Sequence, residues 1–184
     1  MDNGASSYRR FLDGDDSGMV ELIRDYKDGL VLYLNSLTNN LDDAEDLMED
    51  IFFKLAVKKP RFYGRSSFKS WLYAIGHNLA LDFLRKNSKI HGITIQDCER
   101  IASNEDIEQN YIREERKIII HKAISHLKPE YRQVICLIYF EEFDIQETAK
   151  IMRKTKRQIS NMLYQAKKSL RSELEKEGLN HAGL

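Results

Sequence analysis

The chain has 184 residues, of which 42% are hydrophobic and 32% charged, and its 29 basic residues balance 29 acidic ones. A chain of this length and composition can bury one core or two smaller ones, which excludes a wholly disordered protein. With only two prolines and nine glycines among many good helix formers, it is predicted to be all-α.

The sequence carries no signal for export or for membrane insertion. Residues 1–16 are mostly polar and charged, and no run of about 18 apolar residues occurs. Cys98 and Cys136 lie far apart without a second cysteine or a histidine pair nearby, so neither a disulfide framework nor a zinc site is indicated. We expect a cytoplasmic protein that needs no metal and no cofactor.

Charge is distributed unevenly along the chain. Residues 1–60 hold 7 basic and 13 acidic side chains, whereas residues 61–100 hold 7 and 3; the pattern repeats with 6 and 10 in residues 101–148 and 9 and 3 in residues 149–184. This alternation predicts two basic surfaces for phosphates and two acidic surfaces for another partner. The alternative is that the four segments form solvated helix faces whose net charges differ in sign by chance.

The apolar spacing predicts three helices in the first half of the chain. The first runs from Ser17 to Leu37, the second begins at Leu41 and ends before Pro60, and the third runs from about Ser67 to Leu84. The third is preceded by an aromatic and basic loop. Together the three helices are expected to form a compact bundle.

The second half begins with a change of pattern. Residues 87–112 lose the helical period and become polar, which is typical of a linker. Helical spacing resumes near Glu114, and Pro129 suits the first position of a further helix. Residues 143–152, a turn at residues 153–155 and a longer helix from Lys156 have the spacing of a helix-turn-helix. An αα-hairpin without a DNA role has the same spacing.

The predicted helix-turn-helix has a buried and an exposed side. Ala149 is small enough for a close helix crossing, and Ile145 and Met152 are expected to pack beneath it. The outer face of the second helix is rich in basic and amide side chains, which suit phosphates and base edges.

The order of these segments resembles a known family. The acidic stretch DDAEDLMEDIFFKL, then FYGRSSFKSWLYAIGHNLALDFLRK, a linker and a C-terminal helix-turn-helix are similar to bacterial sigma factors of the extracytoplasmic-function (ECF) group. The resemblance covers almost the whole chain. It implies a region 2 domain in residues 1–88, a flexible linker in residues 89–112, a region 4 domain in residues 113–178 and a tail in residues 179–184.

The resemblance also implies the partners. Such a protein binds core RNA polymerase and promoter DNA, and an anti-sigma factor is expected to restrain it, whereas no small-molecule substrate is expected. In the family, the acidic helix contacts the clamp helices of the largest polymerase subunit. The corresponding candidates here are Asp46, Glu49, Asp50, Phe52 and Phe53.

The aromatic and basic stretch would melt and hold the minus-ten element. Holding a base outside the stack needs aromatic walls, a flexible backbone and polar groups for the base edge. The candidate contacts are Arg61, Phe62, Tyr63, Gly64, Arg65, Ser66, Ser67, Lys69, Asn78, Arg85 and Lys86. Phe68 and Trp71 are expected in the core, and His77 on the surface without a special role.

The helix-turn-helix would read the minus-thirty-five element. It departs from the family pattern, because Arg153 occupies a turn position where a small residue or glycine is frequent, and Ser160 stands where basic residues are common. The promoter sequence therefore cannot be carried over from relatives. The candidate contacts are Lys154, Lys156, Arg157, Ser160, Asn161, Tyr164 and Lys168.

Two other classes of function stay open from the residues alone. The first is a stand-alone helix-turn-helix regulator that binds duplex DNA without polymerase, and the second is an interaction protein without a DNA role. An enzyme is not expected, because the sequence contains no glycine-rich phosphate loop, no paired histidines and no nucleophile beside a base in the linear pattern.

Overall fold

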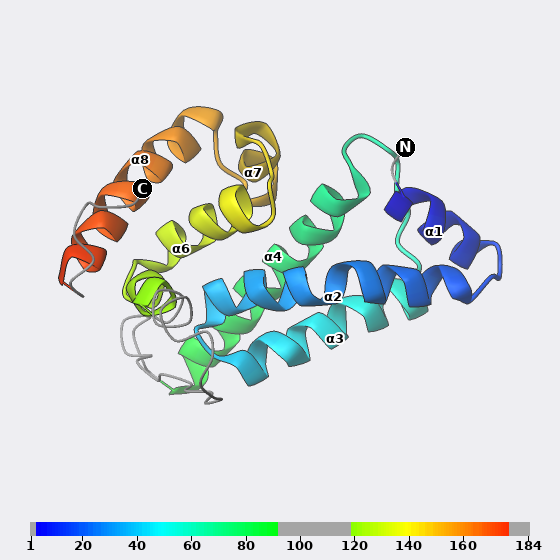
Figure 1. Ribbon diagram of the computed structural model, residues 1–184. Helices are drawn as coiled ribbons and strands as arrows, with labels where there is room; N and C mark the ends of the chain where they lie inside the picture. The colour runs from blue at the N-terminus through cyan, green and yellow to red at the C-terminus, as the bar shows by residue number, and fades with distance from the viewer. Residues whose placement is uncertain (1–2, 92–118, 177–184) are drawn as a thin grey trace, which may run out of the picture.

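The computed structural model describes residues 3–91 and 119–176, and every regular element in these two ranges is a helix. The first range contains α1 (Asn3–Leu12), α2 (Ser17–Thr38), α3 (Leu41–Lys58) and α4 (Phe68–His91) (Figure 1). The second contains a helical segment at 119–125, then α6 (Pro129–Ile135), the π-helix η1 (Cys136–Phe140), α7 (Ile145–Ile151) and α8 (Lys156–Lys176). The predicted all-α fold is confirmed.

Helices α2 and α3 are separated by a break of two asparagines. Asn39 ends α2 with a φ of 54°, a left-handed conformation that asparagine tolerates better than most residues. The side chain of Asn40 then accepts hydrogen bonds from the backbone N–H groups of Asp42 and Asp43, which caps α3. The two helices therefore fold back on each other where the sequence predicted.

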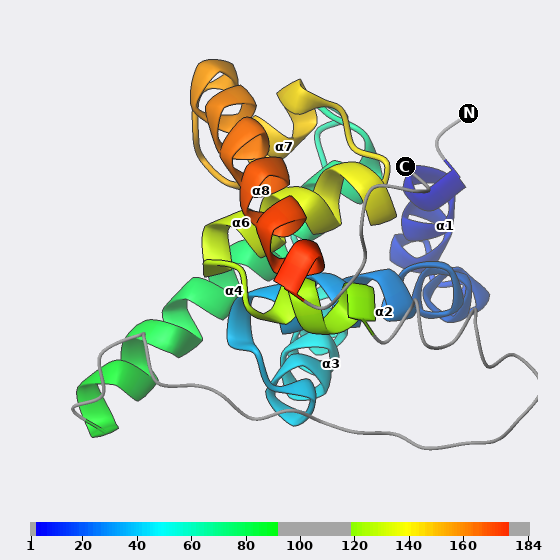
Figure 2. The ribbon, with the colours of Figure 1, turned by 60° about the vertical axis from the view of Figure 1, so that its left-hand side comes forward.

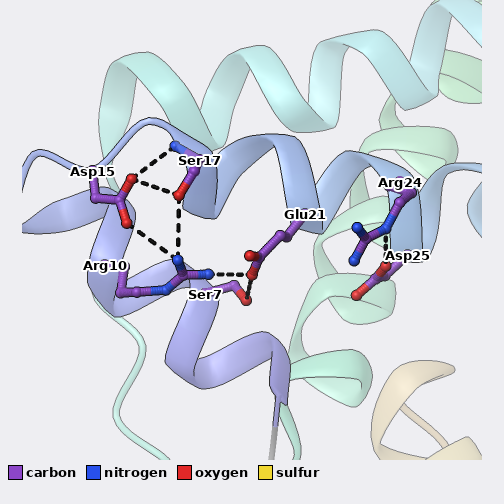
Figure 3. A network of polar contacts seen from close by, with 7 residues as sticks. All are labelled: Ser7, Arg10, Asp15, Ser17, Glu21, Arg24 and Asp25. Atoms are coloured by element: carbon purple, nitrogen blue, oxygen red, sulfur yellow. Dashed lines mark hydrogen bonds and ion pairs between the residues drawn. The ribbon is translucent and has the colours of Figure 1, made fainter.

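Helix α1 precedes the first helix indicated by apolar periodicity, and it lies very close to α2. A Cβ added at Gly18 would lie 2.2 Å from the carbonyl oxygen of Ser7, so only glycine allows this approach. Arg10 forms ion pairs with Glu21 and Asp15, and Ser7 donates to Glu21 at 2.7 Å (Figure 3). The backbone approach and this polar network hold α1 on α2.

A further polar contact lies along α2. Arg24 pairs with Asp25 through Nε at 2.8 Å (Figure 3). Both side chains are well exposed, so this pair contributes little to stability.

The helix-turn-helix forms at the predicted residues. Asp144 caps α7 by accepting from the N–H of Glu147, whose side chain accepts from the N–H of Asp144 in return. Arg153 takes a φ of 53° in the turn, which explains why a glycine would suit this position. Met152 is buried as expected, but the prediction for Ile145 was wrong, because it lies in the first turn of α7 and is 37% exposed.

The two helical domains pack against each other. Helix α4 contacts α7, and α2 contacts α6 and η1. Both views of the ribbon show α6 beside α2 (Figures 1 and 2). The apolar core continues from one domain into the other, with the rings of Tyr73 and Phe143 meeting edge to face at 5.1 Å between centroids. Helix α4 continues to His91, past the predicted boundary at 88, and the rest of the predicted linker lies outside the described residues.

Candidate polymerase and nucleic-acid interfaces

The loop between α3 and α4 exposes one aromatic ring between two cations. Tyr63 is 67% exposed, and the guanidinium carbons of Arg61 and Arg65 lie 5.0 and 5.8 Å from its ring centroid. Gly64 has a φ of +68°, and no heavy atom lies within 4 Å of a Cβ built there. The loop thus offers a stacking surface with positive charge on either side, an arrangement suited to single-stranded nucleic acid.

Phe62, in the same loop, points the other way. Its ring packs against Phe68 and Trp71 at centroid distances of 5.6 and 5.3 Å. It therefore anchors the loop; Phe62 is half-buried, and its contact with DNA stays a prediction. Phe68 is fully buried and Trp71 packs against the core, as the sequence indicated.

The first residues of α4 are bound to the other domain. The Nζ atom of Lys69 lies 3.0 Å from Glu141 Oε2 and donates to the Glu141 carbonyl oxygen at 2.8 Å. The hydroxyl of Tyr73 donates to the same carboxylate at 2.5 Å. In this arrangement Lys69, a candidate phosphate contact, is paired with a carboxylate.

A second carboxylate, that of Glu147, accepts hydrogen bonds from two serines at the N-terminus of α4. Ser67 and Ser70 donate through their hydroxyls to Glu147 Oε1, at 3.1 and 2.7 Å. Ser66 is half-buried beside them and donates to the Ser67 carbonyl oxygen. Glu141 and Glu147 therefore bind the side chains of Lys69 and Ser67, which the sequence predicted to contact the minus-ten strand.

Three other minus-ten candidates lie farther along α4. Asn78 lies roughly 16 Å along the axis from Ser67, at a rise of about 1.5 Å per residue, and its Nδ2 donates to the Ala74 carbonyl oxygen at 2.7 Å. Arg85, which pairs with Asp82 at 2.9 Å, and Lys86 are both exposed. The structure thus does not bring Asn78 into one pocket with the loop. Asn78 and Arg85, seven residues apart, lie on one side of α4, whereas Lys69, nine residues before Asn78, projects from the opposite side.

His77 is buried, which corrects the expectation of a surface histidine. It is 4% exposed, and its Nδ1 lies 2.9 Å from the hydroxyl of Tyr33. Burial lowers the pKa of His77 to about 4, with smaller contributions from the positive charges of Arg153 and Lys154. The ring is therefore neutral at pH 7.

The acidic face of α3 is exposed as predicted, with one exception. Asp46, Glu49 and Asp50 are exposed, and Phe53 is 67% exposed. Phe52 is 6% exposed and belongs to the core, so its assignment to polymerase binding is corrected. Burial raises the pKa of the neighbouring Asp43, and the charges of Asp46 and Asp42 raise it further.

A hollow of about 380 Å³ lies between α2 and α3 beside these acids. Apolar and charged side chains line it together, including Val31, Leu32, Leu41, Met48, Lys27 and Glu49. The acidic face therefore borders a partly apolar depression.

The outer face of α8 presents a continuous row of polar side chains. The row consists of Arg157, Ser160, Asn161, Tyr164 and Lys168, all of them exposed. Ser160 and Asn161 each lie three or four residues from both Arg157 and Tyr164, and Lys168 follows Tyr164 by four, so all five lie along one side of the helix. Lys154 and Lys156, nearer the turn, are bonded to Glu130 at 3.2 Å and to Gln146 at 2.7 Å.

Sequence reasoning missed Glu141 and Glu147. Their partners, in α4 and directly before it, are 68 to 80 positions away in the chain, so no local pattern reveals the contact. The one readable signal was the spacing of Asp144 and Glu147, which is that of a capping box. Within residues 3–91 and 119–176, no group of three or more histidine, cysteine or acidic side chains is placed to hold a metal ion.

Sequence comparison identifies both domains. The family description "Sigma-70 region 2" matches residues 22–90, and "Sigma-70, region 4" matches residues 117–170. The chain is 29% identical over 162 residues to RNA polymerase sigma factor SigV of Bacillus subtilis, covering 88% of this chain and 94% of that protein. It is 27% identical over 165 residues to ECF RNA polymerase sigma factor SigM of the same organism, covering 87% and 96%.

Solved structures share the fold. The sigma factor RpoE of Bartonella quintana, crystallised with the anti-sigma factor NepR, matches with a TM-score of 0.66 and 22% identity, over 88% of this chain and 97% of that one. CnrH, in complex with the cytosolic domain of CnrY, matches with a TM-score of 0.63 and 17% identity, over 94% and 95%. Among the described helices, none is long and apolar enough to cross a membrane. The two family matches, in the order and at the positions of the two helical domains, show that the chain belongs to the ECF group of the sigma-70 family of RNA polymerase sigma factors.

Proposed function

We propose that this sigma factor opens promoters with the loop of residues 61–67, and that Tyr63 is the ring on which an unpaired base of the minus-ten strand stacks. The observation that carries the proposal is the exposed Tyr63 ring between the guanidinium groups of Arg61 and Arg65. Stacking on an aromatic ring accepts any base, while the two cations hold the phosphates on either side of it.

The displaced strand then continues along α4. Asn78 and Arg85 lie seven residues apart on one side of the helix, and Lys86 is next to Arg85, which suits an extended single strand better than one compact pocket. Lys69 projects from the opposite side of the helix, next to the loop. Asn78 reads a base edge and the three cations hold phosphates.

The row on α8 contacts the minus-thirty-five element in duplex DNA. Ser160, Asn161 and Tyr164 lie at its centre and contact base edges, while Arg157 and Lys168 at its ends contact phosphates. Lys154 and Lys156 add phosphate contacts near the turn once they leave Glu130 and Gln146.

The acidic face of α3 binds core RNA polymerase. Asp46, Glu49 and Asp50 supply charge for a basic partner, and Phe53 supplies exposed apolar area beside them. The functional units are residues 1–88 and 113–178, and the protein works in the cytoplasm, where promoters and polymerase meet.

The packed arrangement of the two domains is a resting state. Lys69 and Ser67 cannot reach a DNA strand while Glu141 and Glu147 hold them, so the domains separate when polymerase and promoter are engaged. An anti-sigma factor that binds both domains stabilises the packed arrangement. Equal interdomain distances with and without a candidate inhibitor would count against this role.

The test combines binding and transcription. The purified protein is expected to co-elute with bacterial core RNA polymerase and to direct discrete transcripts from genomic DNA fragments. Asp46→Lys combined with Glu49→Lys should abolish co-elution before any DNA is added. Asp13→Lys with Asp16→Lys changes the net charge equally, at exposed positions between α1 and α2, and should leave co-elution unchanged.

A different result would favour a stand-alone regulator. Binding to a duplex site without any association with polymerase is the outcome that would replace this proposal. Transcription that is indifferent to both pairs of charge reversals would keep the sigma factor function and reject the α3 surface.

A further inference from the structure

Tyr8 of α1 reaches the loop of residues 61–67 from a part of the chain outside the region 2 match at 22–90. Its side chain is 1% exposed, and its hydroxyl donates a hydrogen bond to the carbonyl oxygen of Pro60 at 2.8 Å. Pro60 directly precedes Arg61, so this bond fixes the backbone at the point where the loop begins.

The ring of Tyr8 belongs to the aromatic cluster under the loop. Its centroid lies 5.4 Å from that of Phe68 and 5.6 Å from that of Trp71. Phe62 packs against the same two rings from the loop side. The start of the loop is therefore fixed at two points, because the Pro60 carbonyl oxygen accepts from Tyr8 and the Phe62 ring packs on Phe68 and Trp71. Tyr63 faces outward.

Helix α1 is itself closely packed against its neighbours. A Cβ on Gly4 would lie 2.6 Å from Phe68 Cδ1, and one on Gly18 would meet the backbone of Ser7, so α1 lies against both α4 and α2 at close range. Burial raises the pKa of the Tyr8 phenol to about 12, so the hydroxyl keeps the proton it donates at neutral pH.

We propose that Tyr8 is a positioning residue for promoter opening, which holds the loop so that Tyr63 presents its ring between Arg61 and Arg65. The inference rests on the proposed function of that loop. Helix α1 thereby acts as a support for the minus-ten contact without touching DNA.

The decisive variant is Tyr8→Phe, which removes the hydroxyl and keeps the ring. Tyr33→Phe is the matched control, because it removes a buried hydroxyl of the same domain that contacts His77 instead of the loop. Trp71 is the only tryptophan in the chain and lies in the cluster, so its fluorescence reports whether the rings stay packed.

Two measurements distinguish the effect of Tyr8 on the mobility of the loop from its effect on promoter opening. Trypsin cleavage after Arg61 and Arg65 reports loop mobility in the free protein. Permanganate reactivity of unpaired thymines, on a fragment that yields a mapped transcript, reports opening by the holoenzyme. Tyr8→Phe should accelerate cleavage and reduce opening by about two- to tenfold, the factor expected for one ordinary hydrogen bond. Trp71 emission and co-elution with polymerase should not change.

Each contrary result has a definite meaning. Unchanged cleavage or unchanged opening in Tyr8→Phe overturns the inference, and so does an equal loss of opening in Tyr33→Phe, since the effect would then not be specific to the loop. If the wild-type protein directs no transcript, the proposed function fails, whereas the cleavage rates still decide whether Tyr8 anchors the loop.

Discussion

The loop of residues 61–67 with Lys69 and the outer row of α8 both carry side chains suited to binding DNA, but these side chains differ in their contacts and exposure. Ser67 and Lys69 are bonded to carboxylates of the other domain, whereas the row from Arg157 to Lys168 is exposed. The first surface therefore depends on a movement between domains and the second does not. The packed state can restrain strand opening while leaving duplex recognition available.

The largest effect is expected where a base would stack. Tyr63→Ala combined with Asn78→Ala should reduce strand opening by roughly 10- to 100-fold, because an aromatic ring contributes about 1–3 kcal/mol per stacked base. Permanganate reactivity measures the opening, and binding to core polymerase should stay near the wild-type value. Tyr164→Ala is the control on α8 and should weaken the initial duplex complex instead. Equal opening by wild type and the double variant would remove Tyr63 and Asn78 from the site.

The next effect is expected from protonation of the buried His77. The folded-state pKa of His77, about 4, lies below the unfolded value of about 6.5. The unfolded chain therefore binds this proton first as the pH falls, and stability is lost between about pH 6.5 and pH 4. We expect the free energy of unfolding to fall by about 2 kcal/mol from pH 7 to pH 5.

Urea unfolding of wild type and His77→Gln at both pH values checks this expectation. The variant should lose most of the pH dependence. A wild-type slope that persists in His77→Gln would show that His77 is not its source.

A smaller effect is expected from releasing Lys69. Glu141→Gln removes the charge opposite Lys69 but retains an acceptor for Tyr73, so the packed arrangement should weaken without loss of either fold. The radius of gyration in solution should rise, and affinity for a single-stranded minus-ten oligonucleotide should increase by about three- to tenfold. Glu142→Gln is the control, since this neighbouring acid is exposed. An unchanged radius with unchanged affinity would mean that Glu141 does not restrain the loop.

The smallest effect is expected at the end of the α8 row. Lys168→Ala should lower the slope of log affinity against log salt by about one, while discrimination between promoter sequences stays the same. Filter binding of holoenzyme to a duplex minus-thirty-five fragment over a salt series measures both. A change in sequence preference would instead place Lys168 on a base edge.

Local sequence was a good guide to the helices and to the charged surfaces. The asparagine break after α2, Pro129 at the start of α6 and the turn at Arg153 depend on the conformational preferences of single residues, and all three were predicted. The sequence was a poorer guide to which of two adjacent residues is buried. Phe52 and Phe53 are adjacent in the sequence, and only packing shows that Phe52 lies in the core.

The sequence by itself determined the family, the all-α fold and the order of the two domains, because helical period, turn residues and charge are carried by neighbouring positions. The tertiary structure alone decided which candidates are available to a partner. Glu141 meets Lys69, Tyr8 meets Pro60 and His77 meets Tyr33 across 44 to 72 positions of the chain. Contacts at such distances depend on how the helices pack, and no residue pattern along the chain records them.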